Sequence, residues 1–539
     1  MKKNRRTNRI NYLKSILMPC LFLSGVAGIL TGAIIFLFKL VANLIIHLSI
    51  DIYAAARMSP QYILPVLLGA AVLGALGYFL LRIAPECRGG GIPTAVAALR
   101  GFVSFNWARG ILVLFSSAMI TFFSGVPLGN EGPSVQMGCA VGKGTVDVFA
   151  HKNKAWERYI MTGGACGGFA AATGAPLSGI LFALEEVHRR FSPILFMSVS
   201  TATLASAATM EILSDLTGRK TGLFALSAQP VLPIRFIWIA LAVGAVSGIV
   251  AIFFTRLYRI VNVIVSKAMG KVPFLVKMIG VFMVSAALGL IGAGLVGSGH
   301  ELIDEIFSGE ASVWYLLLVY LIVRGVMLIV ANNVGVTGGT FVPSLAFGAL
   351  VGALCAKAVI ALGVISGEYY ALFIVIGMAS FLAASSRIPL TAIAFSIEAL
   401  AGIGNILPIS VATAFAYLII ETMGIHSFTD TVIEHKIRDN IRGKKSEAID
   451  LHMTVQKGAF AEGKEIRDIL WPPNCVVLSV KRADLMSTGI SAGDILHLRC
   501  LTYDKAETLL VLESLVGVQE ESDIISTHEN EENYSVPEN

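Results

Sequence analysis

The sequence has few charged residues and few cysteines for a chain of 539 residues. Asp, Glu, Lys and Arg together make up only 14% of it and hydrophobic residues 55%, with a mean hydropathy of +0.75. These values exclude an ordinary water-soluble domain as the main part of the protein. The seven cysteines are scattered without a C-x-x-C pair, which argues against a disulfide framework and a zinc site. They are Cys20, Cys87, Cys139, Cys166, Cys355, Cys475 and Cys500.

The sequence also lacks the common signatures of enzymes. It contains no nucleophile paired with a base, no phosphate-binding loop and no cluster of metal ligands. We therefore expect no enzymatic activity, no cofactor and no metal site. The net charge of +5 is not accompanied by a patch that combines basic and aromatic residues, so nucleic acid is not an expected partner.

Apolar runs long enough to cross a bilayer recur from about Ile16 to about Met423. Examples are residues 16–48, 111–128, 237–254 and 314–331. Other stretches, such as residues 161–184, are rich in Gly and Ala, which allow helices to approach closely. Broken helices are tolerated at membrane depth where they line a polar cavity. The predicted fold class is therefore mostly α, a polytopic bundle of tightly packed and partly broken membrane helices.

Basic residues flank the apolar part of the chain on both sides. The N-terminal segment 1–15 and the linker 436–446 contain Lys2, Lys3, Arg5, Arg6, Arg9, Lys14, Lys436, Arg438, Arg442, Lys444 and Lys445. Because basic flanks stay in the cytoplasm, both termini are predicted to lie there, in a multi-pass protein of the cell membrane, a bacterial inner membrane. The first apolar stretch is too long for a signal peptide and has no clear cleavage site, so we expect it to be retained.

One segment of the sequence occurs twice. Residues 129–142 read GNEGPSVQMGCAVG and residues 339–352 read GTFVPSLAFGALVG, with six of fourteen positions identical. A second pair follows, APLSGILFALEE and IPLTAIAFSIEA, and in each a proline precedes a glutamate by nine positions. The two pairs are separated by 210 and 213 residues, which predicts repeats at about residues 16–225 and 226–435. Paired apolar segments interrupted by Gly and Pro indicate the binding site of a transporter.

The duplicated segment combines backbone freedom with a helix start. Gly129 and Gly132 allow the backbone to approach a ligand, and Pro133 is favoured at the first helical position. A helix start inside the membrane offers unpaired N–H groups and the positive end of the helix dipole, which together form an anion site without a basic side chain. The second copy repeats this pattern before Pro343, and the string RGGGIPTA repeats it before Pro93.

A single segment of this kind would be explained more simply as a loop that contains Gly and Pro. Three such segments in one membrane protein, two of them copies, favour three helix N-termini that converge on one dehydrated anion. The third segment contributes Gly89, Gly90 and Gly91.

The first copy also contains an ionisable residue. A carboxylate in an apolar segment, such as that of Glu131, costs about 2.5–3.5 kcal/mol on insertion scales, so a functional reason is expected. The side chain can occupy the amide cradle in place of the anion and leave it on protonation. Glu131 is therefore predicted to act both as a gate and as a proton carrier.

Two further acids, Glu185 and Glu186, lie toward the end of the apolar run LSGILFALEE. An acid here could relay protons from the cytoplasm to Glu131. Equally, it could be a structural acid at a helix end, held by one of the bases that follow. Those bases are His188, Arg189 and Arg190. Glu398, the repeat partner of Glu185, is followed by apolar residues and is predicted to be structural.

In this order and with these separations, the strings GGGIP, GNEGP and GTFVP closely resemble the signature motifs of the CLC family of chloride channels and proton-coupled chloride transporters. The likeness covers about residues 15–435 and includes the APLSGILFALEE segment. It implies a homodimer in membrane lipid, with a separate pore in each subunit and two inverted repeats of mostly tilted helices. Chloride and protons would be the transported ions.

The resemblance also implies which residues bind the anion. The backbone N–H groups of Thr340 and Phe341 would hold a central anion. An external anion would be held by a segment of three residues together with Phe341 and Val342. That segment is Asn130, Glu131 and Gly132.

By the same resemblance, Glu131 matches the external gating glutamate and Glu186 the internal proton glutamate of family antiporters. Because channel members usually lack an acid at the internal position, proton-coupled antiport is favoured over a passive voltage- or pH-gated chloride channel. A third possibility, a membrane protein whose tail senses a ligand, is disfavoured by the two copies of the anion-cradle segment.

Three positions depart from the family pattern. Gly90 stands where most chloride-selective members have Ser, Asn130 where Arg is usual, and Phe428 where a Tyr is expected near the last helix. Both hydroxyl groups that usually contact the central ion would then be absent. Fluoride/proton exchange is therefore an alternative within the family.

Beyond the linker, the composition becomes that of a soluble domain, and residues 447–517 are predicted to form a small α/β domain. Strands are predicted at residues 451–456, 475–482 and 494–500, and helices at residues 463–470 and 504–515. The pattern G-K-x-I-x-x-I, followed by VVLSVKR and AGDIL, resembles the TrkA-C module, which implies dimerisation or sensing of an unidentified small cytoplasmic ligand. Residues 518–539 are acidic and polar, and disorder is predicted for them.

Overall fold

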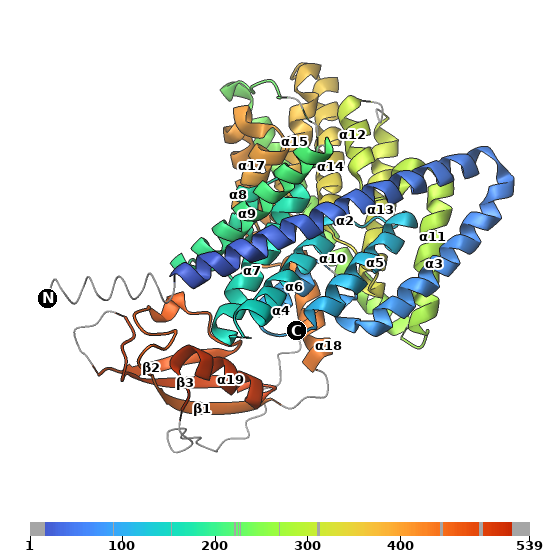
Figure 1. The fold of residues 1–539 in the computed structure, drawn as a ribbon. Coiled ribbons are helices and arrows are strands. Elements are labelled where there is room, and N and C mark those ends of the chain that lie inside the picture. The colour runs from blue at the N-terminus through green and yellow to red at the C-terminus, as the bar shows by residue number, and fades with distance from the viewer. Residues whose placement is uncertain are drawn as a thin grey trace.

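The computed structural model describes residues 17–519 except 90, 152, 220–221, 225, 227, 269, 310–312, 442–445 and 484–488. The basic N-terminus 1–15, Gly90, part of the linker and nearly all of the acidic tail lie outside these described residues. A bundle of helices makes up most of the chain, and a small sheet lies at one end of it, beside α4 and α7 (Figure 1).

The first half of the bundle contains α2 (Met18–Met58), α3 (Ile63–Ile83), α4 (Ile92–Leu99), α5 (Trp107–Phe123), α6 (Glu131–Phe149), α7 (Lys154–Thr173), α8 (Pro176–Phe182), the π-helical turn η4 (Ala183–Val187) and α9 (Pro193–Thr217). The second half contains α10 (Ile237–Ala268), α11 (Phe274–Ile291), α12 (His300–Ser308), α13 (Trp314–Val334), α14 (Phe341–Ala361), α15 (Tyr370–Ser386), α16 (Pro389–Ala399), α17 (Ile406–Thr422) and α18 (Phe428–Ile441).

Within the described part of the chain, nine helices are long and apolar enough to cross a membrane. They are α2, α3, α9, α10, α11, α13, α14, α15 and α17. Large apolar side chains such as Leu44, Leu64 and Ile291 point outward and are mostly exposed, as expected of a surface that lipid covers. The predicted polytopic helical fold is confirmed.

The two halves repeat the same close helix contact. A Cβ atom added to Gly28 on α2 would lie 2.3 Å from the carbonyl oxygen of Ala202 on α9. A Cβ atom added to Gly244 on α10 would lie 2.3 Å from the carbonyl oxygen of Ala412 on α17. Only glycine fits so close a crossing, and its recurrence in both halves supports the predicted duplication.

The C-terminal domain contains β1 (Glu447–Thr454), β2 (Cys475–Lys481), β3 (Ile495–Thr502) and α19 (Lys505–Val516). The strands form an antiparallel sheet in the order β1-β3-β2. The predicted small α/β domain is thus confirmed, while its likeness to the TrkA-C module stays a prediction.

The prediction of a helix at residues 463–470 is wrong. Only a 3-10 turn, Ile466–Asp468, forms there. The start of the segment pairs instead with Ile490, because the N–H of Gly463 donates to the Ile490 carbonyl and the N–H of Ile490 donates to that of Lys464. Those backbone groups are therefore not available to a helix.

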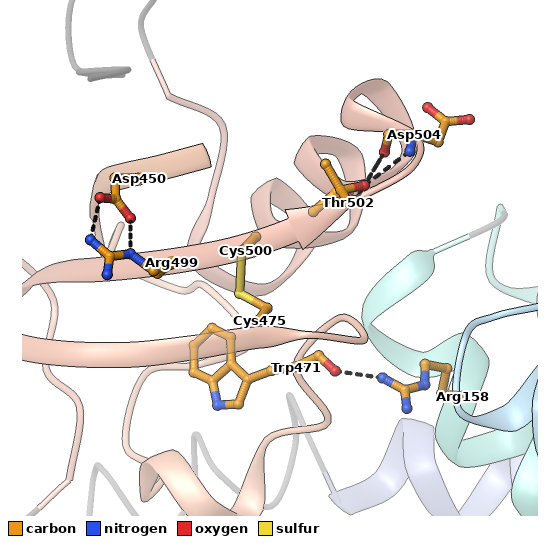
Figure 2. Close-up of a disulfide and its surroundings, with 9 residues drawn as sticks. Arg158, Asp450, Trp471, Cys475, Arg499, Cys500, Thr502 and Asp504 are labelled. Carbon is orange, nitrogen blue, oxygen red and sulfur yellow. Dashed lines mark hydrogen bonds and ion pairs between the residues drawn. A yellow bond between two sulfur atoms is a disulfide. The ribbon is translucent and has the colours of Figure 1, made fainter. Parts of the chain in front are cut away.

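No disulfide framework was expected from the scattered cysteines, but one pair of them is joined. Cys475 on β2 lies opposite Cys500 on β3, and a disulfide joins them (Figure 2). The two residues are 25 positions apart in the sequence, so only the strand register brings them together.

The C-terminal domain packs directly against the start of α7. The guanidinium of Arg158 donates a hydrogen bond to the carbonyl oxygen of Trp471 at 2.6 Å (Figure 2). It donates another to the carbonyl oxygen of Leu470 at 3.3 Å. It also donates at 2.8 Å to the carbonyl oxygen of Leu99, the last residue of α4. One half-buried cation therefore connects the C-terminal domain to two helices of the bundle.

Candidate ion-binding site

The two copies of the duplicated segment meet through their backbones. The N–H of Gly129 donates to the carbonyl oxygen of Gly339 at 2.8 Å, and the N–H of Gly339 donates to that of Gly129 at 2.7 Å. This antiparallel β-bridge lies immediately before the first residues of α6 and α14. The two helix N-termini are therefore held side by side inside the bundle.

The start of the third segment lies against the other two. A Cβ atom on Gly91 would lie 2.9 Å from the Cα of Gly132, and one on Gly132 would lie 2.5 Å from the Cα of Gly339. Gly91 also has a φ of +116°, which disfavours any side chain there. The starts of α4, α6 and α14 therefore lie together, while anion binding at this junction remains a prediction.

The prolines occupy a different helical position from the one predicted. Pro133 and Pro343 are each the third residue of their helices, because α6 begins at Glu131 and α14 at Phe341. The predicted chemistry is unaffected, since N–H groups in the first turn lack helical acceptors. The N–H groups of Glu131 and Gly132 precede one proline, and those of Phe341 and Val342 precede the other.

The carboxylate of Glu131 lies at this junction and is 0% exposed. Both of its oxygens lack a hydrogen-bond partner among the described residues. Oε2 lies over Gly129, 2.4 Å from the position that a Cβ atom would take there. The side chain therefore occupies the dehydrated space beside the helix starts, where the sequence predicted a gate.

The other predicted anion contacts lie on the same elements. Asn130 precedes α6 and lines a cavity next to the junction, and its Oδ1 lacks a partner among the described residues. Thr340 is half-buried and Val342 buried. The ring of Phe341 packs edge-on against Phe169 at 5.0 Å. Gly89, from the α4 segment, is buried and donates its N–H to the Gly335 carbonyl oxygen at 2.8 Å.

Phe428, the first residue of α18, is part of an aromatic cluster. Its ring lies 4.7 Å from that of Tyr258 and 5.5 Å from that of Phe254, both on α10. The Tyr258 hydroxyl donates to Oδ1 of Asn332 at 3.1 Å, and the Asn332 carbonyl oxygen adjoins Gly89. A buried tyrosine hydroxyl, missed in the sequence, thus lies near the α4 segment although residue 428 has none.

Glu186 lies on η4, outside the helices that can span a membrane, and is 1% exposed. Its two carboxylate oxygens lack a hydrogen-bond partner among the described residues. Arg100 donates to its backbone carbonyl oxygen at 2.8 Å and lies 4.0 Å from Asp430. Glu186 is therefore a buried acid with basic and acidic neighbours.

The bases expected to hold a helix-end acid here have other partners. One guanidinium nitrogen of Arg189 donates to both carboxylate oxygens of Asp430, at 2.8 and 2.7 Å. Nε2 of His188 lies 2.9 Å from the hydroxyl of Thr162, and Arg190 donates to the carbonyl oxygen of Ile469. The described contacts therefore do not support a structural ion pair for Glu186.

Glu185 and Glu398 each cap a helix of the other repeat. The carboxylate of Glu185 accepts from the N–H groups of Leu390 and Thr391 at 2.9 and 2.7 Å, at the start of α16. The carboxylate of Glu398 accepts from the N–H groups of Leu177 and Ser178 at 2.7 and 2.8 Å, at the start of α8. Glu398 is therefore structural, as predicted, and Glu185 has the same role.

Two polar residues near Glu131 were not identified in the sequence. Lys39 on α2 is buried, lines the cavity next to Asn130 and interacts electrostatically with Glu131. His300 on α12 places Nε2 3.9 Å from Oε1 of Glu131. A lysine inside the long apolar helix α2 was a signal in the sequence, whereas a histidine 169 positions after Glu131 gave none.

Together, the fold and this junction define a multi-pass membrane protein whose two repeats meet at broken helices around a buried acid. Residues 75–421 match the family described as voltage gated chloride channel, and the chain belongs to this family.

Individual relatives agree with this assignment. The H(+)/Cl(-) exchange transporter ClcA of Klebsiella pneumoniae is 30% identical over 426 residues, which cover 78% of this chain and 89% of the relative. ClcA of Vibrio vulnificus is 28% identical, with coverages of 78% and 90%. The fold is similar to a slow cyanobacterial Cl-/H+ antiporter, with a TM-score of 0.72, 23% identity and coverages of 78% and 99%. It is also similar to a CLC-type fluoride/proton antiporter, with a TM-score of 0.62, 20% identity and coverages of 75% and 96%.

Proposed function

We propose that the protein is a proton-coupled chloride antiporter of the cell membrane, in which the Glu131 carboxylate competes with the anion for the helix N-termini. The supporting observation is the fully buried carboxylate of Glu131 at the junction of three helix starts, without a hydrogen-bond partner among the described residues. A charged carboxylate and a chloride ion cannot both occupy this dehydrated space, because like charges repel strongly there. Protonation removes the charge and frees the helix N-termini for the anion.

The anion is held by backbone N–H groups in this proposal. The backbone N–H groups of Thr340 and Phe341 hold the anion at the central position. The backbone N–H groups near Asn130, Gly132 and Val342 hold it at the external position, next to the cavity. Partial positive charges at the starts of α6 and α14 favour an anion without a basic side chain in contact. The similarity to the ClcA proteins, which are H(+)/Cl(-) exchange transporters, supports the same ions here.

Glu186 carries protons at the other end of the pathway in this proposal. Its burial and its lack of a hydrogen-bond partner among the described residues make it a group that can exist in both protonation states. Burial and the neighbouring Asp430 oppose the charged form, whereas Arg189, Arg100 and the side chain of Thr429 favour it. A passive channel would not require this acid.

Fluoride/proton exchange is the second candidate. The observation that favours it is the side chain of Phe428, which presents an aromatic ring and no hydroxyl. Residue 428 therefore offers the anion no hydroxyl contact. Flux assays with each halide separate the two candidates.

The assembly and orientation are part of the same proposal. We expect a homodimer in lipid with both termini in the cytoplasm. Lys464 of the C-terminal domain interacts electrostatically with Cys20 near the start of α2, which supports placement of the two ends of the chain on one side. The C-terminal domain would sense a small cytoplasmic ligand there.

The test is simultaneous measurement of chloride and proton flux in proteoliposomes under opposed gradients. Proton uptake driven by a chloride gradient is expected of the wild type. Glu131→Gln should abolish proton flux and leave anion flux unchanged. Glu186→Gln should lower proton flux alone. Glu211→Gln, at an exposed position of α9, is the matched control. Unchanged proton flux in both variants would refute the assigned pathway.

A further inference from the structure

Glu131 has no direct access to water, although a proton carrier must exchange its proton with the solution. Its side chain is 0% exposed, whereas that of His300 is 25% exposed. His300 lines a cavity of about 290 Å³ that also contacts Lys39 and Asn130. The imidazole therefore lies between this cavity and the buried carboxylate, with Nε2 3.9 Å from Oε1.

The local structure fixes His300 in this place. Gly299 before it has a φ of +111°, and a Cβ atom there would lie 2.8 Å from Ala346 on α14. The preceding loop is held by Arg324, which donates to the carbonyl oxygens of Val296 and Gly297 at 2.9 and 2.8 Å. The start of α12 is thus packed against the same helix that supplies the proposed anion site.

The position of α12 determines which solution His300 contacts. Figure 1 shows α12 at the end of the bundle opposite the C-terminal sheet. If the C-terminal domain is cytoplasmic, the cavity opens to the external side. The ring of Phe224 lies 5.1 Å from the imidazole and limits the access of water from one direction.

We propose that His300 transfers protons between the external solution and Glu131, an inference that rests on the proposed antiport. In the inward direction, the Nε2–H bond of the imidazolium breaks and an O–H bond forms on Oε1 of Glu131. The neutral imidazole then takes up a proton that hydronium or a buffer acid of the external solution delivers through the cavity. The separation of 3.9 Å is longer than a hydrogen bond and is closed by a rotation of either side chain.

Charged groups from several elements surround the cavity and His300. The titratable and charged groups on or around the cavity and the imidazole are Lys39, His47, Arg57, Glu131, Glu301, Asp304, Glu305 and Arg324. Proton flux is therefore compared at a single pH and only between matched variants.

The experiment combines removal of the imidazole with chemical rescue. Proton flux driven by a chloride gradient is measured at equal pH on both sides for the wild type, His300→Ala and His300→Gln. Both variants should lose at least about tenfold in proton flux, a threshold set below the roughly 10²–10⁴-fold that general acid–base groups typically contribute. Free imidazole, added to both sides, should restore proton flux in His300→Ala but not in a His300→Ala, Glu131→Gln double variant.

His47→Gln is the matched control, because His47 lines the same cavity on α2. It should retain wild-type proton flux, and protein-free vesicles with imidazole correct for leak. Proton flux in both His300 variants within about twofold of wild type would overturn the inference. So would a loss that imidazole leaves unchanged, since that result indicates a structural role. Antiport by the wild type and its loss in Glu131→Gln would still support the proposed function, so the two failures are distinguishable.

Discussion

The ammonium nitrogen of Lys39 lies 2.8 Å from the backbone carbonyl oxygen of Ala172, in the last turn of α7. The negative end of the α7 dipole thus stabilises a cation inside the membrane domain. The same lysine lines the cavity and interacts electrostatically with Glu131. Residue 130 is Asn where family members usually have Arg, so Lys39 supplies a positive charge near that position.

Replacement of Lys39 by Met should weaken attraction of the anion into the cavity. At separations of several ångströms and an effective dielectric constant near 20, one charge contributes about 1–3 kcal/mol. We expect the KM for chloride applied on the cavity side to rise roughly tenfold or more with a small change in kcat. Chloride flux at varied concentration measures this, with Lys39→Arg retaining the charge. Lys143→Met, on the far part of α6, is the control, and an unchanged KM in Lys39→Met would contradict the prediction.

The reciprocal caps made by Glu185 and Glu398 should stabilise the interface between the repeats. Glu185→Ala leaves N–H groups at the start of α16 without an acceptor, and Glu398→Ala does the same at α8. Each change should destabilise the protein by about 2–3 kcal/mol, because charge-assisted hydrogen bonds at a helix N-terminus are lost. Thermal unfolding in detergent measures the loss, with Glu211→Ala as control. A large loss of proton flux without destabilisation would instead assign Glu185 a transport role.

The caps made by Glu185 and Glu398 could not be predicted from the sequence, whereas two helix starts could. The starts of α6 and α14 could be predicted because Gly and Pro specify backbone geometry locally. The partners of Glu185 lie 205 and 206 positions away, and their proximity depends on how two repeats pack. The interpretation of Glu185 as a proton relay or a locally paired acid therefore missed its role.

In the C-terminal domain, too, the local elements could be predicted from the sequence and the contacts between them could not. Alternating apolar residues predicted its strands within a few positions, because the two faces of a sheet differ in burial. The Cys475–Cys500 pair depends on strand register, and the irregular segment near Gly463 depends on pairing with Ile490. Neither contact is encoded in local periodicity.

Tyr159 should control how firmly the C-terminal domain is attached to the bundle. Its hydroxyl donates to the Asp468 carbonyl oxygen at 2.8 Å and accepts from the N–H of Leu470 at 3.0 Å. Tyr159→Phe keeps the ring but removes both hydrogen bonds, at a cost of about 1–3 kcal/mol. We expect trypsin to cleave the basic linker before β1 faster in Tyr159→Phe than in the wild type. Gel electrophoresis of timed samples measures the cleavage rate. Tyr315→Phe, at an exposed position, is the control; equal cleavage rates in both variants would argue against this attachment.

Lys464 should make the stability of the C-terminal domain depend on pH. Burial lowers the pKa of its ammonium group from the ordinary 10.5 to about 7. The unfolded chain therefore binds more protons between about pH 7 and 10.5, so stability rises with pH across this window and falls as the pH drops toward 7. The slope is at most about 1.4 kcal/mol per pH unit.

Comparison with Lys464→Met isolates this contribution, because Met retains an apolar side chain of similar length and does not titrate. Thermal unfolding in detergent is measured at pH 7, 8 and 9. The stability of the wild type minus that of the variant should rise with pH, so the variant is relatively more stable at pH 7. The buried ammonium donates to the carbonyl oxygen of Phe460 and lies 3.6 Å from the centre of its ring. If these contacts offset burial fully, the two proteins would show parallel pH profiles, and the predicted shift would be wrong.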